Sequence, residues 1–279
     1  SEYCLAPNAP MPIENTSDEI ALLASQDDIV ALKFDELSFG IADLDNNVVL
    51  DEKGCRSTAV FSVGNSRSGS PGRFEDVFVS PKDLYKQGYV IDASKTISGM
   101  ITPTQSEVIK ETGTYACDVS AMFAVSSHYV TLNRLKLPDL YHELWQLSGT
   151  SGDPNKSFDQ ATGLYFTQGR TPSPNAAPAI KEFCARRGKR LETSFAWYPS
   201  WDSFRATADS GNLSIFSGTL RSSHDAHAMA VAGYVAMHNT YSNDKKYMLV
   251  VWDGWFNQLR FLPYDTTIYI SHEGTYCGE

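Results

Sequence analysis

The order of two sequence patterns along the chain limits the folds open to it. Apolar residues recur at helical spacing across residues 119–137, namely Met122, Val125, Tyr129, Leu132 and Leu135, and this run ends before Pro138. Further helices are expected at 140–147 and 175–187. Strand-like segments follow at 213–216, 228–234, 247–252, 258–262 and 267–270. Helices followed by an antiparallel sheet predict an α+β fold.

The first 98 residues have a different character. Short strand-like segments occur at 29–34, 48–50, 59–63 and 77–79, and turn-forming residues separate them. A short helix is expected at 17–25. We therefore expect a β-rich N-terminal region at 1–98, acting as an accessory domain, an inhibitory pro-region or an extension of the sheet. The main domain is expected at 99–279.

Composition narrows the classes of function. The chain has 279 residues, 42% of them hydrophobic, which is enough for a large core in one sizeable domain or two small ones. No run reaches the roughly 18 apolar residues of a membrane span, and the N-terminus lacks the features of a signal peptide. The net charge of −10 argues against a nucleic-acid partner, because phosphate binding needs clustered Lys and Arg. No membrane partner is expected either.

A cysteine stands at the junction between a glycine-containing loop and an apolar helical run. In the stretch from Glu111 to Val125, Cys117 follows Gly113 and precedes the helical pattern. The first turn of a helix has unpaired N–H groups and the positive end of the helix dipole, so a cysteine there is biased toward the thiolate. Cys117 is therefore the candidate nucleophile.

Two later residues supply the partners that such a nucleophile needs. His227 precedes an apolar segment that ends in Gly233 and Tyr234, and Asp253 follows another apolar segment. A histidine can take the thiol proton and return it to the leaving amine, while a carboxylate can accept from the other ring nitrogen. Trp255 could shield that hydrogen bond from water.

These residues resemble the papain-like cysteine peptidases over roughly residues 100 to 270. In that superfamily a Gln lies six positions before the nucleophile, the His starts a strand running into Gly-Tyr, and Asn-Ser-Trp ends the next strand. Glu111, Cys117, His227 and the segment Asp253-Gly-Trp255 occupy these positions. The first segment is also similar to the motif of the bacteriocin-leader-processing peptidases. The resemblance implies a two-lobed papain-like fold with Cys117, His227 and Asp253 as a triad. It also implies a helix and turn at 157–169, packed beside the helix of Cys117.

Two features of the match leave alternatives open. Glu111 stands where the family supplies a neutral oxyanion donor, and an ionised carboxylate would repel a developing oxyanion unless it were protonated or pointed elsewhere. A second alignment sets Ser120 against the nucleophile. The alignment on Cys117 is preferred for two reasons. It places Glu111 and Gly113 at suitable distances in the sequence before the nucleophile. It also leaves Met122 and Phe123 on the buried face of the helix.

The predicted activity is hydrolysis of an amide bond in a peptide or protein, without a cofactor or metal. A transglutaminase or deamidase would use the same triad, and a catalytically inert papain-like binding module is the alternative from another class. A third possibility places ligand binding in the first hundred residues. The oligomeric state is left open. His224, Asp225 and His227 could ligate a metal, but they lack a partner elsewhere in the sequence.

Two further features bear on location and on partners. If Cys117 is free, the other four cysteines, Cys4, Cys55, Cys184 and Cys277, could form two disulfides, which favours a secreted or extracytoplasmic protein. Five reduced thiols in a cytosolic protein are the alternative. The aromatic residues Phe195, Trp197, Tyr198 and Trp201 indicate either a substrate or partner surface or core packing.

Overall fold

A computed structural model describes residues 29–33, 39–43, 48–51, 56–57 and 73–279. In the first part, four short strands form an antiparallel sheet in chain order: β1 (Ile29–Lys33), β2 (Phe39–Asp43), β3 (Val48–Asp51) and β4 (Arg56–Ser57). The strands expected at 29–34 and 48–50 are thus confirmed. The helix expected at 17–25 and the strand at 59–63 lie outside the described residues. At 77–79 there is no strand, and Val79 forms a single bridge to Phe261.

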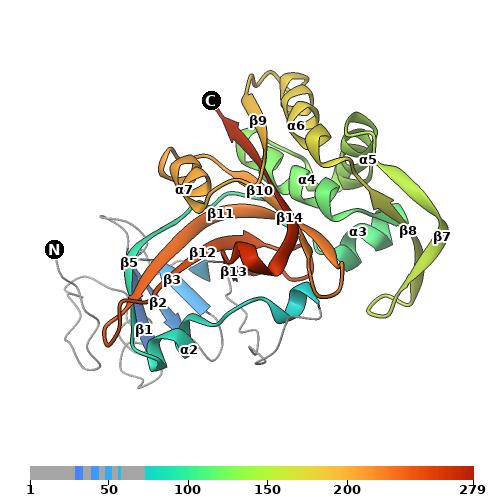
Figure 1. The fold of residues 1–279 in the computed structure, drawn as a ribbon. Coiled ribbons are helices and arrows are strands. Elements are labelled where there is room, and N and C mark those ends of the chain that lie inside the picture. Colours follow the sequence, from blue (N-terminus) through green and yellow to red (C-terminus); the bar gives the residue numbers. More distant parts are fainter. Residues whose placement is uncertain (1–28, 34–38, 44–47, 52–55, 58–72) are drawn as a thin grey trace.

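An antiparallel sheet of seven strands dominates the described part of the chain (Figure 1). Six strands lie in the order β13, β12, β11, β10, β14, β9, and β5 pairs with β11. Their bounds are β5 (Tyr89–Thr96), β9 (Glu192–Trp197), β10 (Ser214–Leu220), β11 (Ala226–Asn239), β12 (Lys245–Trp252), β13 (Leu259–Pro263) and β14 (Tyr269–Gly278). With the helices described below, this sheet confirms the α+β class.

The long strand β11 organises the sheet. Along one edge its first half pairs with β10 and its second half pairs with β5, while β12 pairs along the other edge. Gly233 lies where β5 comes closest, because a β-carbon there would sit 1.9 Å from the carbonyl oxygen of Lys95. The predicted domain boundary at residue 98 therefore falls just after a strand of the main sheet, and β5 belongs with the elements that follow it.

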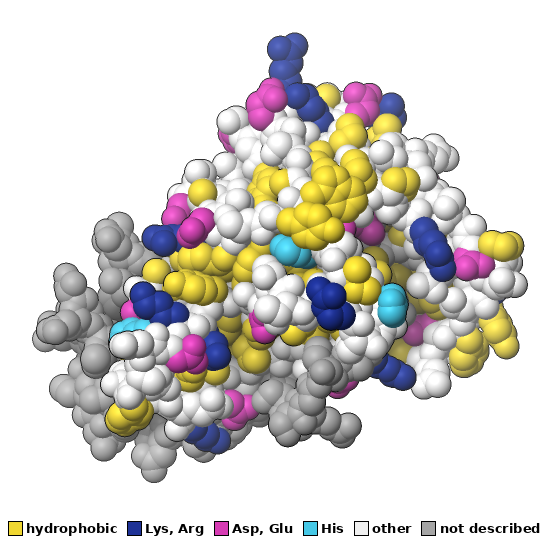
Figure 2. Space-filling model, in the orientation of Figure 1, with side chains coloured by type: hydrophobic (Ala, Val, Ile, Leu, Met, Phe, Trp, Pro, Cys, Tyr) yellow, Lys and Arg dark blue, Asp and Glu magenta, His cyan; other side chains and the backbone are white. Residues whose placement is uncertain are grey.

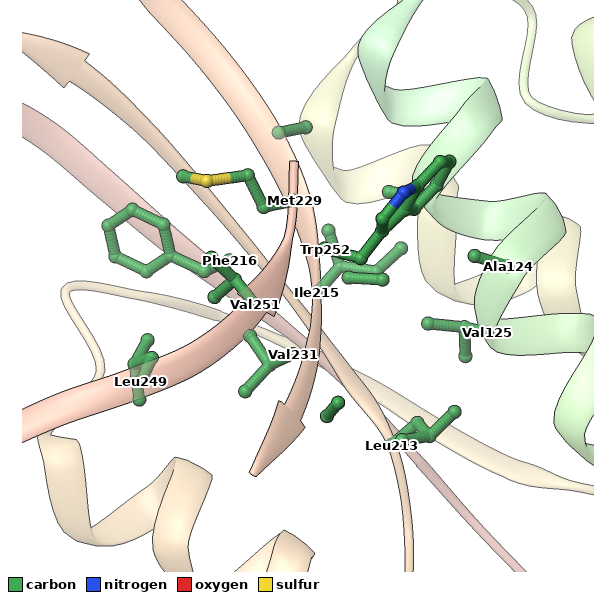
Figure 3. Packing of buried hydrophobic residues seen from close by; sticks show 14 of the residues in the cluster. Ala124, Val125, Leu213, Ile215, Phe216, Met229, Val231, Leu249, Val251 and Trp252 are labelled. Carbon is green, nitrogen blue, oxygen red and sulfur yellow. The ribbon is translucent and has the colours of Figure 1, made fainter. Parts of the chain in front are cut away.

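Helices cover both faces of this sheet. On one face Ile215, Ala230 and Trp252 are cross-strand neighbours. Figure 3 shows Ile215 and Trp252 on the side of the sheet that faces α4 (Cys117–Tyr129). Helices α3 (Gln105–Thr112), α5 (Leu137–Leu147) and α6 (Ala176–Ala185) pack around α4 or the helices next to it. On the other face, α7 (Trp201–Asp209) places Phe204 against Phe216. A short helix, α2 (Pro81–Lys86), precedes β5.

The sheet, together with α5 and α6, buries α4 almost completely. Its residues 119–126 are all buried, although only one side of an ordinary surface helix would be. Small side chains on the facing strand, such as Ala228, Ala230 and Ala232, allow the close approach. The start of this central helix is consequently fixed against β11.

Local sequence sets the loop that leads into α4. Helix α3 begins with a capping box, in which the Thr104 hydroxyl accepts from the Glu107 N–H and the Glu107 carboxylate accepts from the Thr104 N–H. It ends at Gly113, whose left-handed backbone (φ 66°) suits glycine. The chain then forms β6 (Thr114–Tyr115) and enters α4 two residues later.

The structure corrects two predicted elements. The helix expected over 119–137 ends at Tyr129, and Leu135, expected on its apolar face, is 90% exposed. Pro138 opens α5 instead of ending the previous helix, since proline is well suited to a first helical turn. The helix and turn expected at 157–169 are in fact strands, as β7 (Ser151–Asp159) and β8 (Leu164–Arg170) form a hairpin that pairs with β6.

That hairpin carries exposed apolar side chains near its tip. Phe158, Leu164 and Tyr165 are exposed, and Figure 2 shows hydrophobic side chains at this position on the lower right. The remaining predictions agree better with the structure: helices at 140–147 and 175–187 and strands at 213–216, 228–234, 247–252 and 258–262 are confirmed within a few residues. The last expected strand starts at Tyr269, so most of it lies beyond 267–270.

The cysteines do not follow the predicted two-disulfide arrangement. Cys184 and Cys277 are free, buried thiols, whereas Cys4 and Cys55 lie outside the described residues. Among the described helices, none combines the length and apolar character needed to cross a membrane.

Candidate active site

Cys117 begins the central helix with its sulfur surrounded by backbone N–H groups. The N–H groups of Cys117, of Asp118 and of Ala228 on β11 lie near enough to the sulfur to favour the thiolate. The preceding residue, Ala116, is clamped by Tyr141, whose hydroxyl donates to the Ala116 carbonyl oxygen (3.0 Å) and lies 2.9 Å from its N–H. The nucleophile predicted from the sequence is thus held at a helix start and next to β11.

The surroundings of Cys117 keep it protonated at rest. Burial raises the pKa of its thiol to about 12, and the negative charge of Asp118, whose Oδ2 lies 3.9 Å from the sulfur, adds to the rise. The N–H groups act in the opposite direction but are outweighed. A thiol with this pKa does not ionise unaided at neutral pH, so its attack requires a base.

Three neighbours hold the imidazole of His227 in place. Its Nε2 lies 2.7 Å from the backbone carbonyl oxygen of Asp253. Its ring lies against Trp255, with centroids 4.2 Å apart and planes at 10°, and Phe74 packs 5.7 Å away. A carbonyl can only accept, so Nε2 carries the proton and Nδ1 keeps a free lone pair. Burial lowers the pKa of His227, which favours this neutral form.

Asp253 uses a different atom from the one expected. The sequence predicted that its carboxylate would accept from His227, but the acceptor is its backbone carbonyl. The carboxylate itself accepts from the guanidinium of Arg260 (2.7 Å) and from the N–H groups of Trp255 (2.9 Å) and Phe256 (3.3 Å). Asp253 and Arg260 are both buried, and this ion pair fixes the turn that presents the carbonyl to His227.

Glu111 lies apart from the other three predicted residues. Its carboxylate binds Arg134 at 3.0 Å at the exposed end of α3. Within the described part of the chain it forms no hydrogen bond with Cys117, His227 or Asp253. The structure thus brings Cys117 beside the strand of His227 and joins His227 to Asp253, while Glu111 points elsewhere.

Other residues near the site were missed in the sequence. Asp118 immediately follows Cys117, and this adjacency was the available signal. Tyr115 is buried beside the site, with its hydroxyl 2.6 Å from where a β-carbon on Gly254 would lie. Arg260 could be assigned only from the fold, because nothing in its neighbourhood in the sequence marks it as the partner of Asp253.

Ser120 as nucleophile and a metal site around His224 are the alternatives that the sequence left open. Ser120 is buried, and its hydroxyl lies 3.3 Å from that of Tyr141 on the inner side of α4. The described residues contain no group of three or more His, Cys, Asp or Glu side chains that could hold a metal ion. Asp225 accepts from the N–H of Phe74 at 3.0 Å.

Comparison of the sequence with known protein families finds no match, and comparison with curated proteins finds none either.

Proposed function

We propose that the chain is a papain-like cysteine hydrolase that cleaves an amide bond in a peptide or protein. The proposal depends above all on the state of His227. Its Nε2 is bound to the Asp253 carbonyl under the cover of Trp255, and the next residue, Ala228, offers its N–H to the sulfur of Cys117. A fixed tautomer with a free Nδ1 suits a proton acceptor, and the Ala228 N–H places the start of β11 beside the thiol of Cys117.

The reaction follows from these groups. Nδ1 of His227 takes the thiol proton, and the sulfur of Cys117 attacks the amide carbonyl carbon. The N–H of Cys117, at the positive end of α4, stabilises the resulting oxyanion. The imidazolium gives its proton to the departing amine, and a thioester remains. Water, deprotonated by His227, then hydrolyses the thioester and restores the thiol.

The fold supports the proposal at a coarser level. A buried helix that starts with the cysteine lies against an antiparallel sheet whose long strand has the histidine as its second residue. This arrangement agrees with the two-lobed papain-like fold that the sequence resemblance implies. The proposal includes that fold.

A second candidate is a catalytically inert binding module with the same architecture. Two observations favour it: Glu111, at the position of the oxyanion donor, is bound to Arg134, and the pKa of Cys117 is raised to about 12. An inert module would keep the shape of the site without a reactive thiol.

Alkylation of the native protein distinguishes the two. Iodoacetamide labelling followed by peptide mapping should give a fast adduct at Cys117 and at no other cysteine that the structure describes, since Cys184 and Cys277 are buried. His227→Gln should lower the rate of adduct formation at least tenfold. His128→Gln should leave the rate unchanged, because His128 lies on the same helix as Cys117 but has no part in the proposed reaction. Cys117→Ala should abolish the adduct. An unreactive Cys117, or one that is indifferent to His227, would establish the inert module.

A further inference from the structure

A row of four residues runs across the sheet from the candidate nucleophile. Ser217 on β10 is directly opposite Ala228 on one side and opposite Glu273 on the other. Glu273 on β14 is in turn opposite Trp197 on β9. Directly opposed residues of antiparallel strands point to the same face, so these four side chains line one face of the sheet. Since the Ala228 N–H reaches the sulfur of Cys117, the row begins at the site.

Asp118 closes this row from the side of α4. Its Oδ1 lies 3.4 Å from the Ser217 hydroxyl, and its Oδ2 lies 3.9 Å from the sulfur of Cys117. Two carboxylates, those of Asp118 and Glu273, therefore flank Ser217 directly beside the candidate nucleophile.

These two carboxylates lack a cation. Neither forms an ion pair among the described residues, and Glu273 has only the Ser271 hydroxyl as a polar partner although it is 7% exposed. Burial raises the pKa of Asp118 to about 7 and also raises that of Glu273, and the charge of Glu273 raises the pKa of Asp118 further. A carboxyl group shielded from water without a counter-charge either holds its proton or takes up a positive group, so this pair can accept a cation.

Trp197 adds a second feature that suits a cation. It is 55% exposed although it is a large aromatic side chain, and it lies next to Glu273 in the row. An indole face attracts ammonium and guanidinium groups, and these groups also form hydrogen bonds with carboxylates. An aromatic wall beside two unpaired carboxylates therefore matches the side chain of lysine or arginine.

We propose that Asp118, Glu273 and Trp197 form a subsite for a cationic side chain of the substrate, adjoining the bond that Cys117 attacks. This inference rests on the proposed function, because it specifies the substrate class of the same site. A cationic side chain bound in this subsite would also change the reactivity of Cys117. The charge of Asp118 opposes ionisation of Cys117, so a cation bound to Asp118 would make the thiol easier to deprotonate.

Three small alkylating agents of different charge test the subsite without a known substrate. The agents are 2-bromoethylammonium (cationic), iodoacetamide (neutral) and iodoacetate (anionic). Each rate at Cys117 is divided by the rate of the same agent with N-acetylcysteine at the same pH, which removes differences in intrinsic reactivity. The proposal expects the normalised cationic rate to exceed the neutral rate by roughly tenfold and the anionic rate to be the lowest.

Matched variants assign the preference to the subsite. Glu273→Gln should reduce the ratio of cationic to neutral rates about threefold or more, and Asp118→Asn should do the same, whereas Glu192→Gln on the exposed end of β9 should leave it unchanged. Using a ratio cancels any general effect of Asp118 on the reactivity of the thiol.

Each possible outcome decides a different question. Reaction at Cys117 without a charge preference, or with a preference that survives Glu273→Gln, would overturn the subsite and leave the proposed hydrolase standing. The absence of an adduct at Cys117 with all three agents would overturn the hydrolase and the subsite together.

Discussion

The indole of Trp255 lies flat on the imidazole of His227, with ring centroids 4.2 Å apart and an interplanar angle of 10°. The indole covers one face of the imidazole, and Nε2 of the same imidazole is bound to the carbonyl of Asp253. Water is thereby kept from a hydrogen bond that defines the tautomer of the candidate base. The same cover contributes to the burial that lowers the pKa of His227.

Trp255→Ala should raise the pKa of His227 toward its ordinary value, because burial is the main cause of the lowered pKa. A ¹H–¹³C NMR titration of the imidazole signals measures the change, with His227→Gln to assign the resonance. Trp255→Phe keeps an aromatic cover and should hold the pKa close to that of the unaltered protein. An unchanged pKa in Trp255→Ala would show that the indole does not exclude water.

Asp118→Asn should stabilise the protein at alkaline pH. Its pKa is about 7 in the folded state against an ordinary value of 3.8, so the folded state binds more protons than the unfolded state between these values, and stability falls as the pH rises through 7. The gain at pH 8 should be about 2 kcal/mol after allowing for the solvent that reaches this half-buried carboxylate. At pH 4 the gain should disappear.

Urea unfolding at the two pH values measures this difference, and Glu192→Gln serves as the control. That carboxylate is exposed, so its replacement should change the unfolding free energy by less than about 0.5 kcal/mol at either pH. A gain from Asp118→Asn that is equal at pH 4 and pH 8 would contradict the linkage to its ionisation.

Arg260→Met should destabilise the fold by about 3–5 kcal/mol. The substitution leaves the carboxylate of Asp253 buried without its counter-charge, and it also removes the guanidinium that lies 3.6 Å from the ring centre of Phe78. Chemical denaturation measures the loss.

The double variant Arg260→Met/Asp253→Asn provides the control for that interpretation. It removes the stranded charge, so it should be more stable than Arg260→Met alone by at least about 1 kcal/mol. If the double variant were the less stable of the two, lost packing rather than the buried charge would explain the effect of Arg260→Met.

Gly233→Ala should detach β5 from β11 or distort their pairing. A β-carbon there would lie 1.9 Å from the carbonyl oxygen of Lys95, and backbone cannot move aside as a flexible side chain can. We expect a loss of about 2 kcal/mol or more in denaturant unfolding, with faster amide hydrogen exchange across residues 89–96. Gly278→Ala is the matched control, because its added β-carbon would meet only Asn212 at 3.5 Å.

The sequence predicted where the main strands and helices lie better than it predicted the residues at which they end. Hydrophobic periodicity continues past Tyr129 to Leu135, but the helix stops because Val130 takes an extended backbone and the Tyr129 hydroxyl bonds to the N–H of Leu213. That bond joins residues 84 positions apart, and no local pattern reveals it. The exposed position of Leu135 follows from the same early stop.

The hairpin of β7 and β8 was mistaken for a helix and turn for a similar reason. Its apolar residues are few, and its strands are mostly exposed, so neither helical nor strand periodicity is pronounced. The decisive contact is the pairing of β8 with β6, which lies some fifty residues earlier in the chain. Tertiary pairing, and not local preference, determines the structure there.

For the candidate site, the order of residues in the sequence identified the candidate residues but not the atoms through which they make contact. Cys117, His227 and Asp253 were chosen by type and spacing, and the structure places Cys117 beside the strand of His227 and His227 against Asp253. Spacing could not show that Arg260 would take the carboxylate of Asp253 and leave the carbonyl for His227. Nor could it show that Arg134 would draw Glu111 away.

The pairing of β5 with β11 has a consequence for any shortened form of the chain. A fragment starting at residue 99 would leave the backbone groups of residues 233–239 open along one edge of β11. An uncovered strand edge recruits strands from other molecules, and this one lies in a mostly buried, apolar strand. By pairing with this edge, residues 89–96 therefore protect the strand that carries His227 from self-association.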